Sequence, residues 1–227
     1  MDRCRNLEDV LEAIEKACLR SGRRKEEVKL LGASKTVPAQ VIERFYRCGL
    51  RSFGENRAQE FVSKHETLSH LNIDWHFIGR LQTNKVKYLI GRVSLIHSVD
   101  RTSLAEEIQK RASRAGTVQE VLIEVNVGNE ESKGGVSADG VKSLLEHVIS
   151  LPNVKPLGLM TIPPYRENSQ EVRPFFTKLR ELRDKLEEEF KLSLPHLSMG
   201  MSNDFEVAIE EGATIVRVGT KLFGERS

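Results

Sequence analysis

The sequence predicts a single (β/α)8 barrel of the TIM type, preceded by an extra N-terminal helix. Eight short segments of near-continuous apolar residues alternate with helical segments, which is typical of parallel strands covered by helices. The count of eight favours closure into a barrel over an open doubly wound sheet. The expected strands are residues 28–34, 51–53, 74–78, 93–99, 120–126, 155–161, 196–198 and 214–218.

The helical segments are recognised by apolar spacing and by residues typical of helix ends. An amphipathic helix is expected over residues 6–20, with Asn6 as its N-cap. Pro38 begins the helix after the first strand, and Ser103 with Glu106 has the spacing of a capping box. Further helices are expected over residues 57–68, 83–90, 138–150, 172–190 and 203–211. With no Gly/Pro-rich linker in the chain, we expect one domain over residues 1–227.

Composition limits the class of protein. The chain has 227 residues, of which 39% are hydrophobic and 30% charged, and no apolar run approaches the ~20 residues of a membrane span. Its N-terminus lacks a signal-peptide pattern. The net charge of +2 is close to balance, so no nucleic-acid partner is expected. We therefore expect a cytoplasmic monomer.

The three cysteines, Cys4, Cys18 and Cys48, are odd in number and lack CxxC spacing. They are interpreted as reduced thiols, not as a disulfide framework or a zinc site. The chain also has no HExxH motif and no P-loop, so no metal is expected. His76 and His97 lie within expected strands, and we interpret them as core histidines with satisfied hydrogen bonds.

Lys35 ends the first expected strand, and the carboxyl ends of barrel strands converge on one mouth where function is located. A lysine near a strand end is most often solvated. However, its alternation partners Leu31 and Ala33 are apolar, which places Lys35 over the core. A partly desolvated lysine has a lowered pKa and forms Schiff bases.

The last strand carries a complementary set of groups. Arg217 alternates with outward-facing valines, so we expect it to face the barrel axis; the alternative is a structural ion pair with Glu124. Gly219 and Thr220 follow it and suit phosphate binding. Ser198, at the end of the seventh strand, is a second phosphate-ligand candidate.

Two polar residues near the mouth have alternative interpretations. Ser202 is interpreted as a plain N-cap. Asn56, at the end of the second strand, either donates to a ligand hydroxyl or caps the next helix. Residues 130–135 are either a mobile flap over the mouth or an ordinary flexible loop.

Six segments together resemble a known family and span nearly the whole chain. They are Ala33-Ser34-Lys35-Thr36, Phe53-Gly54-Glu55-Asn56, the run from Trp75 to Lys85, Gly158-Leu159-Met160, Leu197 to Ser202, and Arg217-Val218-Gly219-Thr220. In this order they resemble the pyridoxal-phosphate homeostasis protein family, which is related in fold to the N-terminal barrel of alanine racemase.

The resemblance implies that Lys35 holds pyridoxal 5′-phosphate as an aldimine and that Arg217 faces the pyridine nitrogen. It further implies that Ser198, Gly219 and Thr220 bind the phosphate and that Asn56 lies near the ring. It assigns no role to Arg80.

Two classes of function remain, besides an aldolase-type Schiff-base barrel that would not explain all six segments. One is an intracellular carrier and buffer of pyridoxal 5′-phosphate in vitamin B6 homeostasis, which hands the cofactor to apo-enzymes. The other is an amino-acid racemase of fold type III. The sequence ends seven residues after Thr220, so we expect no β-domain with a tyrosine acid/base. Arg217 would also keep the pyridine nitrogen unprotonated, and both features favour the carrier.

Overall fold

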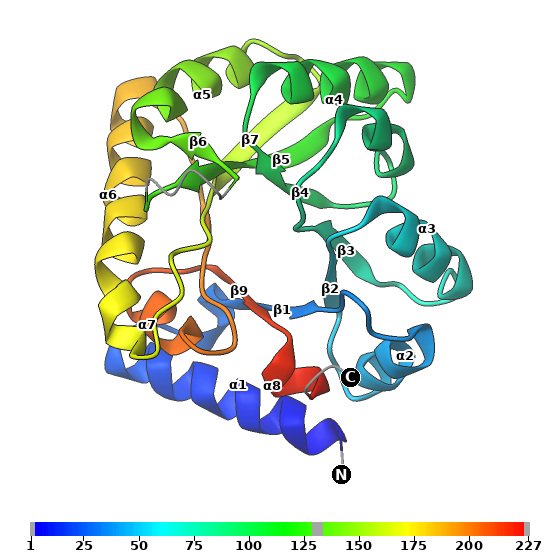
Figure 1. Cartoon of the computed structure of the whole chain (residues 1–227), viewed down its shortest axis with the longest axis vertical. Helices are drawn as coiled ribbons and strands as arrows, with labels where there is room; N and C mark the ends of the chain where they lie inside the picture. The colour runs from blue at the N-terminus through cyan, green and yellow to red at the C-terminus, as the bar shows by residue number, and fades with distance from the viewer. Residues whose placement is uncertain (1–2, 129–133, 225–227) are drawn as a thin grey trace.

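The computed structural model describes residues 3–128 and 134–224, and in these residues eight parallel strands close into a barrel (Figure 1). The ring runs β1, β2, β3, β4, β5, β7, β8 and β9, and β9 pairs with β1. The barrel strands are β1 (Lys29–Ala33), β2 (Ser52–Glu55), β3 (Asp74–Phe77), β4 (Leu95–Val99), β5 (Gln119–Asn126), β7 (Val154–Met160), β8 (His196–Ser198) and β9 (Ile215–Val218). The predicted (β/α)8 barrel is therefore confirmed.

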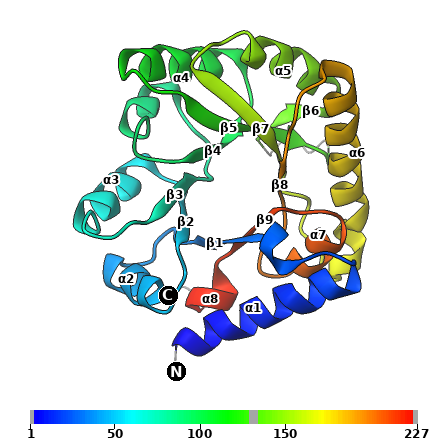
Figure 2. The ribbon, with the colours of Figure 1, turned by 180° about the vertical axis from the view of Figure 1, so that it is seen from behind.

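Helices surround this ring on its outer side (Figure 2). They are α1 (Arg3–Arg20), α2 (Ala39–Arg47), α3 (Ala58–Thr67), α4 (Thr102–Arg114), α5 (Val141–Ile149), α6 (Arg173–Phe190), α7 (Phe205–Glu210) and α8 (Thr220–Phe223). The additional N-terminal helix α1 packs against α7 and α8. None of the helices in the described ranges is long and apolar enough to cross a membrane.

The apolar residues form two separate cores, one inside the barrel and one between the barrel and the helices. The inner core comprises Leu31, Leu95, Leu122, Met160 and Ile215. The larger outer core includes Val216 and Val218. Side chains of a strand alternate between its two faces, so Arg217 shares the inner face with Ile215, as predicted.

Several local expectations are wrong. The segment after β3 is a 3₁₀ helix (Thr83–Tyr88), not an α-helix, and its amides bond to carbonyls three residues back, as Lys85 does to Gln82. A short strand β6 (Val136–Ser137) pairs with β5 and was not predicted.

Two helix starts also differ from the expectation. Helix α4 has Arg101 as its N-cap, without a side-chain capping bond, so Ser103 and Glu106 form no capping box. Asn6 lies inside α1 instead of capping it. Its side-chain amide donates to the Leu222 carbonyl at 3.0 Å, which ties α1 to α8. Both side chains were assigned local roles because sequence spacing does not reveal contacts with distant segments.

The expectation of three reduced thiols is also wrong. Cys4 and Cys48 form a disulfide with a Cα–Cα distance of 5.5 Å, and Cys18 is free and buried. The two cysteines are 44 residues apart, and only the packing of the first turn of α1 beside the end of α2 brings them together.

Candidate functional site

A cavity of about 440 Å³ opens at the carboxyl ends of β1, β7, β8 and β9. Four of the predicted site residues line this mouth cavity, and they come from both ends of the chain: Lys35, Arg217, Gly219 and Thr220. Its other lining residues are Ala33, Ile162, Pro163, Pro164, Tyr165, Arg166, Met201, Ser202, Asn203 and Asp204. The barrel therefore brings together an amine, a guanidinium and a glycine-threonine turn.

The chain around Lys35 is held in an unusual conformation. Thr36, the next residue, has φ of 62°, in the left-handed region that non-glycine residues rarely adopt. Its backbone amide donates to Glu60 Oε1 at 2.5 Å, which holds this turn against α3. The turn directs the chain away from β1 immediately after Lys35, leaving the half-buried lysine at the cavity wall.

The buried ion pair of Lys64 and Glu55 holds the chain just before Lys35. Lys64 Nζ donates to the Ser34 carbonyl at 2.7 Å, to Glu55 Oε1 at 2.8 Å and to Glu60 Oε1 at 2.6 Å. Glu55 is fully buried and also accepts from Ser34 Oγ at 2.5 Å. Burial raises the pKa of the Glu55 carboxyl, and Lys64 opposes that rise.

Lys64 was not predicted as a structural residue, although its position in the sequence indicates one. Lys64 lies three residues after Phe61 and six after Ala58, on the buried face of α3. A charged residue at a core position of an amphipathic helix must be paired, since an unpaired charge is costly to bury.

Arg217 lies beneath the cavity and is only 4% exposed. Its Nη1 donates to Ser198 Oγ at 2.6 Å and its Nη2 to the Thr161 carbonyl at 2.8 Å. Within the described residues, Arg217 is therefore held by these two hydrogen bonds and not by the alternative ion pair with Glu124. Burial lowers the pKa of Arg217 to about 10, and the charges of Glu124 and Asp204 oppose the shift.

Ser202 contacts the turn after β9, which was not predicted from the sequence. Its Oγ accepts from the backbone N–H of Gly219 at 3.2 Å and of Lys221 at 3.4 Å, so these amides converge on one point of the cavity wall. It is not the N-cap of α7, which is Asp204. A pair of converging backbone N–H groups is typical of phosphate-binding turns.

Ser198 and Asn56 do not line the mouth cavity. Ser198 is fully buried beneath it, and its Oγ contacts Arg217 and His97. Asn56 lines a separate cavity of about 490 Å³ beyond β2 and β3, together with Arg80. The strand ends were identified correctly, but strand twist and the depth of each residue in the barrel decide which side chains reach a given cavity.

Two carboxyl groups near Arg217 have pKa values raised by burial. Glu124 is 7% exposed, and burial together with the nearby charge of Asp100 raises its pKa to about 7. Burial likewise raises the pKa of Asp204, whose Oδ1 accepts from the Met201 amide at 2.6 Å.

Two other segments lie near the mouth or were considered as its cover. Tyr165 lines the cavity but is 72% exposed. Of residues 130–135, interpreted as either a flap or an ordinary flexible loop, positions 130–133 lie outside the described residues. No cluster of three or more metal-ligating side chains occurs within residues 3–128 and 134–224.

The chain matches a known protein family over most of its length. The family model for the alanine racemase N-terminal domain matches residues 12–227. The chain is 66% identical over 226 residues to the pyridoxal phosphate homeostasis protein of Aquifex aeolicus, covering 100% of this chain and 99% of the relative. It is 40% identical over 221 residues to the protein of the same description from Pseudomonas aeruginosa, covering 97% and 94%.

Solved structures agree with these relatives. PipY of Synechococcus elongatus, solved with pyridoxal phosphate bound, superposes with a TM-score of 0.82 at 35% identity, covering 93% of this chain and 99% of PipY. Alanine racemase of Clostridium difficile has a TM-score of 0.77 at 16% identity and is covered over 57% of its length. The second likeness shows the fold alone.

The match of the family model over residues 12–227 places this closed parallel barrel in the alanine racemase N-terminal domain class. Within this class, the near-complete coverage and high identity are decisive. The chain belongs to the pyridoxal phosphate homeostasis protein family.

Proposed function

We propose that this chain binds pyridoxal 5′-phosphate covalently at Lys35 and acts as a cytoplasmic, monomeric carrier and buffer of this cofactor, which it releases to apo-enzymes. The supporting observation is the mouth cavity itself, which combines Lys35, the backbone amides at Ser202 and the guanidinium of Arg217. Its volume of about 440 Å³ lies in the usual range for small-molecule sites. The names of the relatives support the same ligand.

The residues fit a flat aldehyde that carries a phosphate. The Ser202 and Thr220 hydroxyls offer donors to a dianionic phosphate, and the Gly219 and Lys221 amides, which donate to Ser202 Oγ in this structure, would turn to the phosphate when it binds. Ser202 therefore takes the phosphate-binding role first expected for Ser198. The unprotonated Lys35 amine attacks the aldehyde carbon, a C=N bond forms, and the carbonyl oxygen leaves as water.

Arg217 would face the ring nitrogen of the bound ligand. Bound pyridoxal phosphate supplies an electron sink whose strength depends on protonation of that nitrogen. A positively charged guanidinium donates a hydrogen bond to it and disfavours its protonation. The electron sink is thereby weakened, which suits storage better than turnover.

Borohydride reduction tests the covalent site. The protein is loaded with pyridoxal 5′-phosphate, reduced and mapped by peptide mass spectrometry. The pyridoxyl label is expected on Lys35 and absent in Lys35→Ala, whereas Lys221→Ala, at an exposed lysine nearby, should label like the parent. Label on Lys221 in the parent protein would overturn the assignment.

Racemase activity is the alternative, and Tyr165 is the residue that would support it. Racemisation needs acid/base groups on both faces of the substrate Cα–H bond, and Tyr165 lines the cavity that Lys35 also lines. We expect no Cα deuterium exchange faster than a slow background when the loaded protein is incubated with amino acids in D₂O. Exchange above ~1 s⁻¹ that is lost in Tyr165→Phe would favour the racemase.

A further inference from the structure

A continuous chain of hydrogen bonds runs through the barrel interior from Asp74 to Arg217. Asp74 Oδ2 lies 3.1 Å from His76 Nε2, and His76 Nδ1 lies 2.8 Å from His97 Nε2. His97 Nδ1 lies 2.9 Å from Ser198 Oγ, which accepts from Arg217 Nη1 at 2.6 Å. Four strands, β3, β4, β8 and β9, contribute to this chain. We call these five residues the polar chain.

The chemistry of its two ends sets the direction of the bonds when each imidazole carries one proton. An arginine can only donate and an ionised carboxylate can only accept. Ser198 accepts from Arg217, so its own hydrogen is available for His97 Nδ1. His97 then carries its proton on Nε2 and donates to His76 Nδ1, and His76 donates from Nε2 to Asp74. In this arrangement each imidazole carries its proton on Nε2.

Burial supports the neutral state of the His97 imidazole. His76 is 1% exposed and His97 and Ser198 are 0% exposed. Burial lowers the pKa of His97 well below its ordinary value, and the charge of Arg217 acts in the same direction. The other charged or titratable groups facing the chain are Lys29, Glu120, Glu124, His196 and Asp204.

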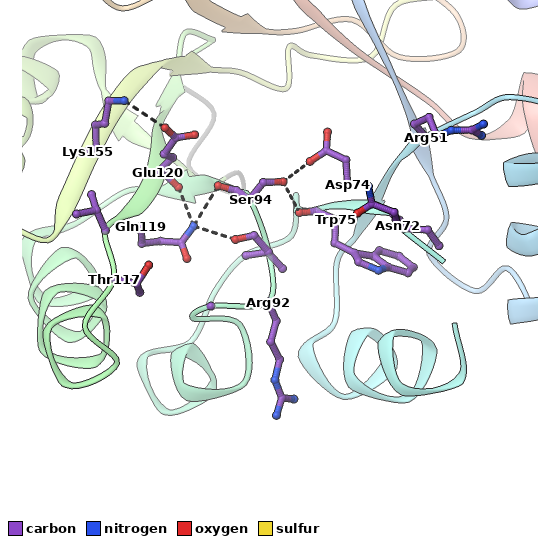
Figure 3. Close-up of a pocket in the computed structure, with 14 residues that line it drawn as sticks. Arg51, Asn72, Asp74, Trp75, Arg92, Ser94, Thr117, Gln119, Glu120 and Lys155 are labelled. Carbon is purple, nitrogen blue, oxygen red and sulfur yellow. Dashed lines mark hydrogen bonds and ion pairs between the residues drawn. The ribbon is translucent and has the colours of Figure 1, made fainter. Parts of the chain in front are cut away.

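The carboxylate end of the polar chain opens at the opposite end of the barrel from Lys35. Asp74 lines a cavity of about 940 Å³ at the amino ends of the strands. Figure 3 shows the hydrogen bond that the Ser94 hydroxyl donates to the Asp74 carboxylate in this cavity. Lys29 Nζ and Ser52 Oγ each donate to Asp74 Oδ2 at 2.8 Å. Burial opposes ionisation of Asp74, but the bonds from His76, Lys29 and Ser94 outweigh it and keep its pKa well below the ordinary value.

We propose that His76, His97 and Ser198 are positioning residues that hold the Arg217 guanidinium in the orientation needed to meet the ring of a ligand bound at Lys35. Arg217 has five N–H donors, and the Ser198 and Thr161 bonds hold it by Nη1 and Nη2 from the interior side. The remaining donors supply the contact with the ligand. This proposal rests on the proposed function for the identity of the ligand, but the arrangement of the polar chain does not depend on it.

Protonating His97 would disturb this arrangement. A doubly protonated His97 would direct Nδ1–H at Ser198 Oγ, which already accepts from Arg217. The serine hydrogen would then lose its acceptor in a fully buried position, which is unfavourable. The polar chain thus favours one polarity, in which Ser198 Oγ accepts from Arg217 and donates to His97.

The apo-protein tests the polar chain without any cofactor. Two-bond ¹H–¹⁵N correlation spectra of ¹⁵N-labelled protein distinguish the two neutral tautomers and the imidazolium of each histidine. We expect a neutral Nε2–H signal for His97 from pH 6 to pH 8, and a proton on Nε2 of His76. A tautomer protonated only on Nδ1 at either residue, or an imidazolium at His97, in this range would overturn the proposal.

Ser198→Ala tests the positioning role. Ser150→Ala is the matched control, because Ser150 is exposed and its hydroxyl donates to the nearby His147 carbonyl. Ser198→Ala should weaken pyridoxal 5′-phosphate binding about tenfold and shift its absorption band, because Arg217 loses an acceptor. Lys35 should still take the borohydride label. Unchanged affinity and an unchanged band would overturn the positioning role. Failure of the parent protein to bind the cofactor would instead overturn the proposed function and leave the tautomer result standing.

Discussion

The ammonium group of Lys64 has three oxygen partners within 2.8 Å and is almost completely enclosed. Buried ion pairs add little net stability, but removal of one partner leaves an uncompensated charge. Lys64 therefore links the stability of the fold to the geometry of the turn that carries Lys35.

Lys64→Met should lower the free energy of unfolding by about 3–5 kcal/mol, because Glu55 is left buried without its cation. Urea denaturation measures this loss, and Lys16→Met, at an exposed lysine, is the control. The double variant Lys64→Met/Glu55→Gln should recover part of it. Equal stability of the parent and Lys64→Met would contradict the buried-pair interpretation.

Glu124 makes the stability of the barrel depend on pH. Its pKa of about 7 in the folded protein lies above the ordinary glutamate value of 4.5, so the folded state favours the protonated form. This contribution is fully present below pH 4.5 and is lost as pH rises through 7.

Glu124→Gln should therefore gain stability relative to the parent between pH 5 and pH 8, by at most about 3 kcal/mol. Urea unfolding of both proteins at the two pH values measures the difference. Glu181→Gln, at an exposed glutamate, should show no such divergence. If the difference in unfolding free energy between the parent and Glu124→Gln is the same at both pH values, the pKa of the Glu124 carboxyl is not raised in the folded protein.

At the scale of elements, the pairing of β7 with β8 depends on one glycine. Gly158 lies opposite His196 in the register and has φ of +153°. A Cβ atom at this position would lie 1.8 Å from the His196 carbonyl oxygen, a backbone atom that cannot move without displacing β8. Because β8 carries Ser198, the close approach of these strands also sets the depth of the polar chain.

Gly158→Ala should destabilise the protein by on the order of 3 kcal/mol or more, as judged by thermal unfolding. Gly22→Ala is the matched control, since Gly22 also has positive φ but a Cβ there meets nothing within 4 Å. That control should lose only about 1–2 kcal/mol. Similar losses in the two variants would mean that conformation, and not strand approach, limits position 158.

At the scale of the whole molecule, α1 links distant parts of the fold. It contacts α7 and α8, and the Cys4–Cys48 disulfide joins its first turn to the end of α2. It thereby connects α8, which follows Gly219, with the end of α2. The disulfide encloses a long loop, which restricts the unfolded chain.

Cys48→Ser should reduce stability by up to about 4 kcal/mol on the loop-entropy model for a separation of 44 residues. Thiol titration of denatured, unreduced protein should find one free thiol, Cys18, and reduction should raise the count to three. Dithiothreitol should lower the melting temperature of the parent but not that of the variant. Three free thiols before reduction would exclude the disulfide.

The sequence by itself determined the barrel, because each apolar strand segment and each helical segment is recognised locally, and eight such pairs in order indicate closure. It also predicted the inward direction of Arg217 from the two-residue period of a strand. Lys35, Gly219 and Thr220 were assigned to one cavity because the strand ends of a barrel converge.

Only the tertiary structure decided which polar groups meet. Ser198 and Ser202 are four residues apart, yet one lies buried beneath Arg217 and the other faces the cavity. The Lys64–Glu55 pair, the disulfide and the polar chain likewise join residues from different elements. Sequence periodicity specifies the face on which a side chain lies, whereas strand register and the depth of each residue in the barrel select its partner.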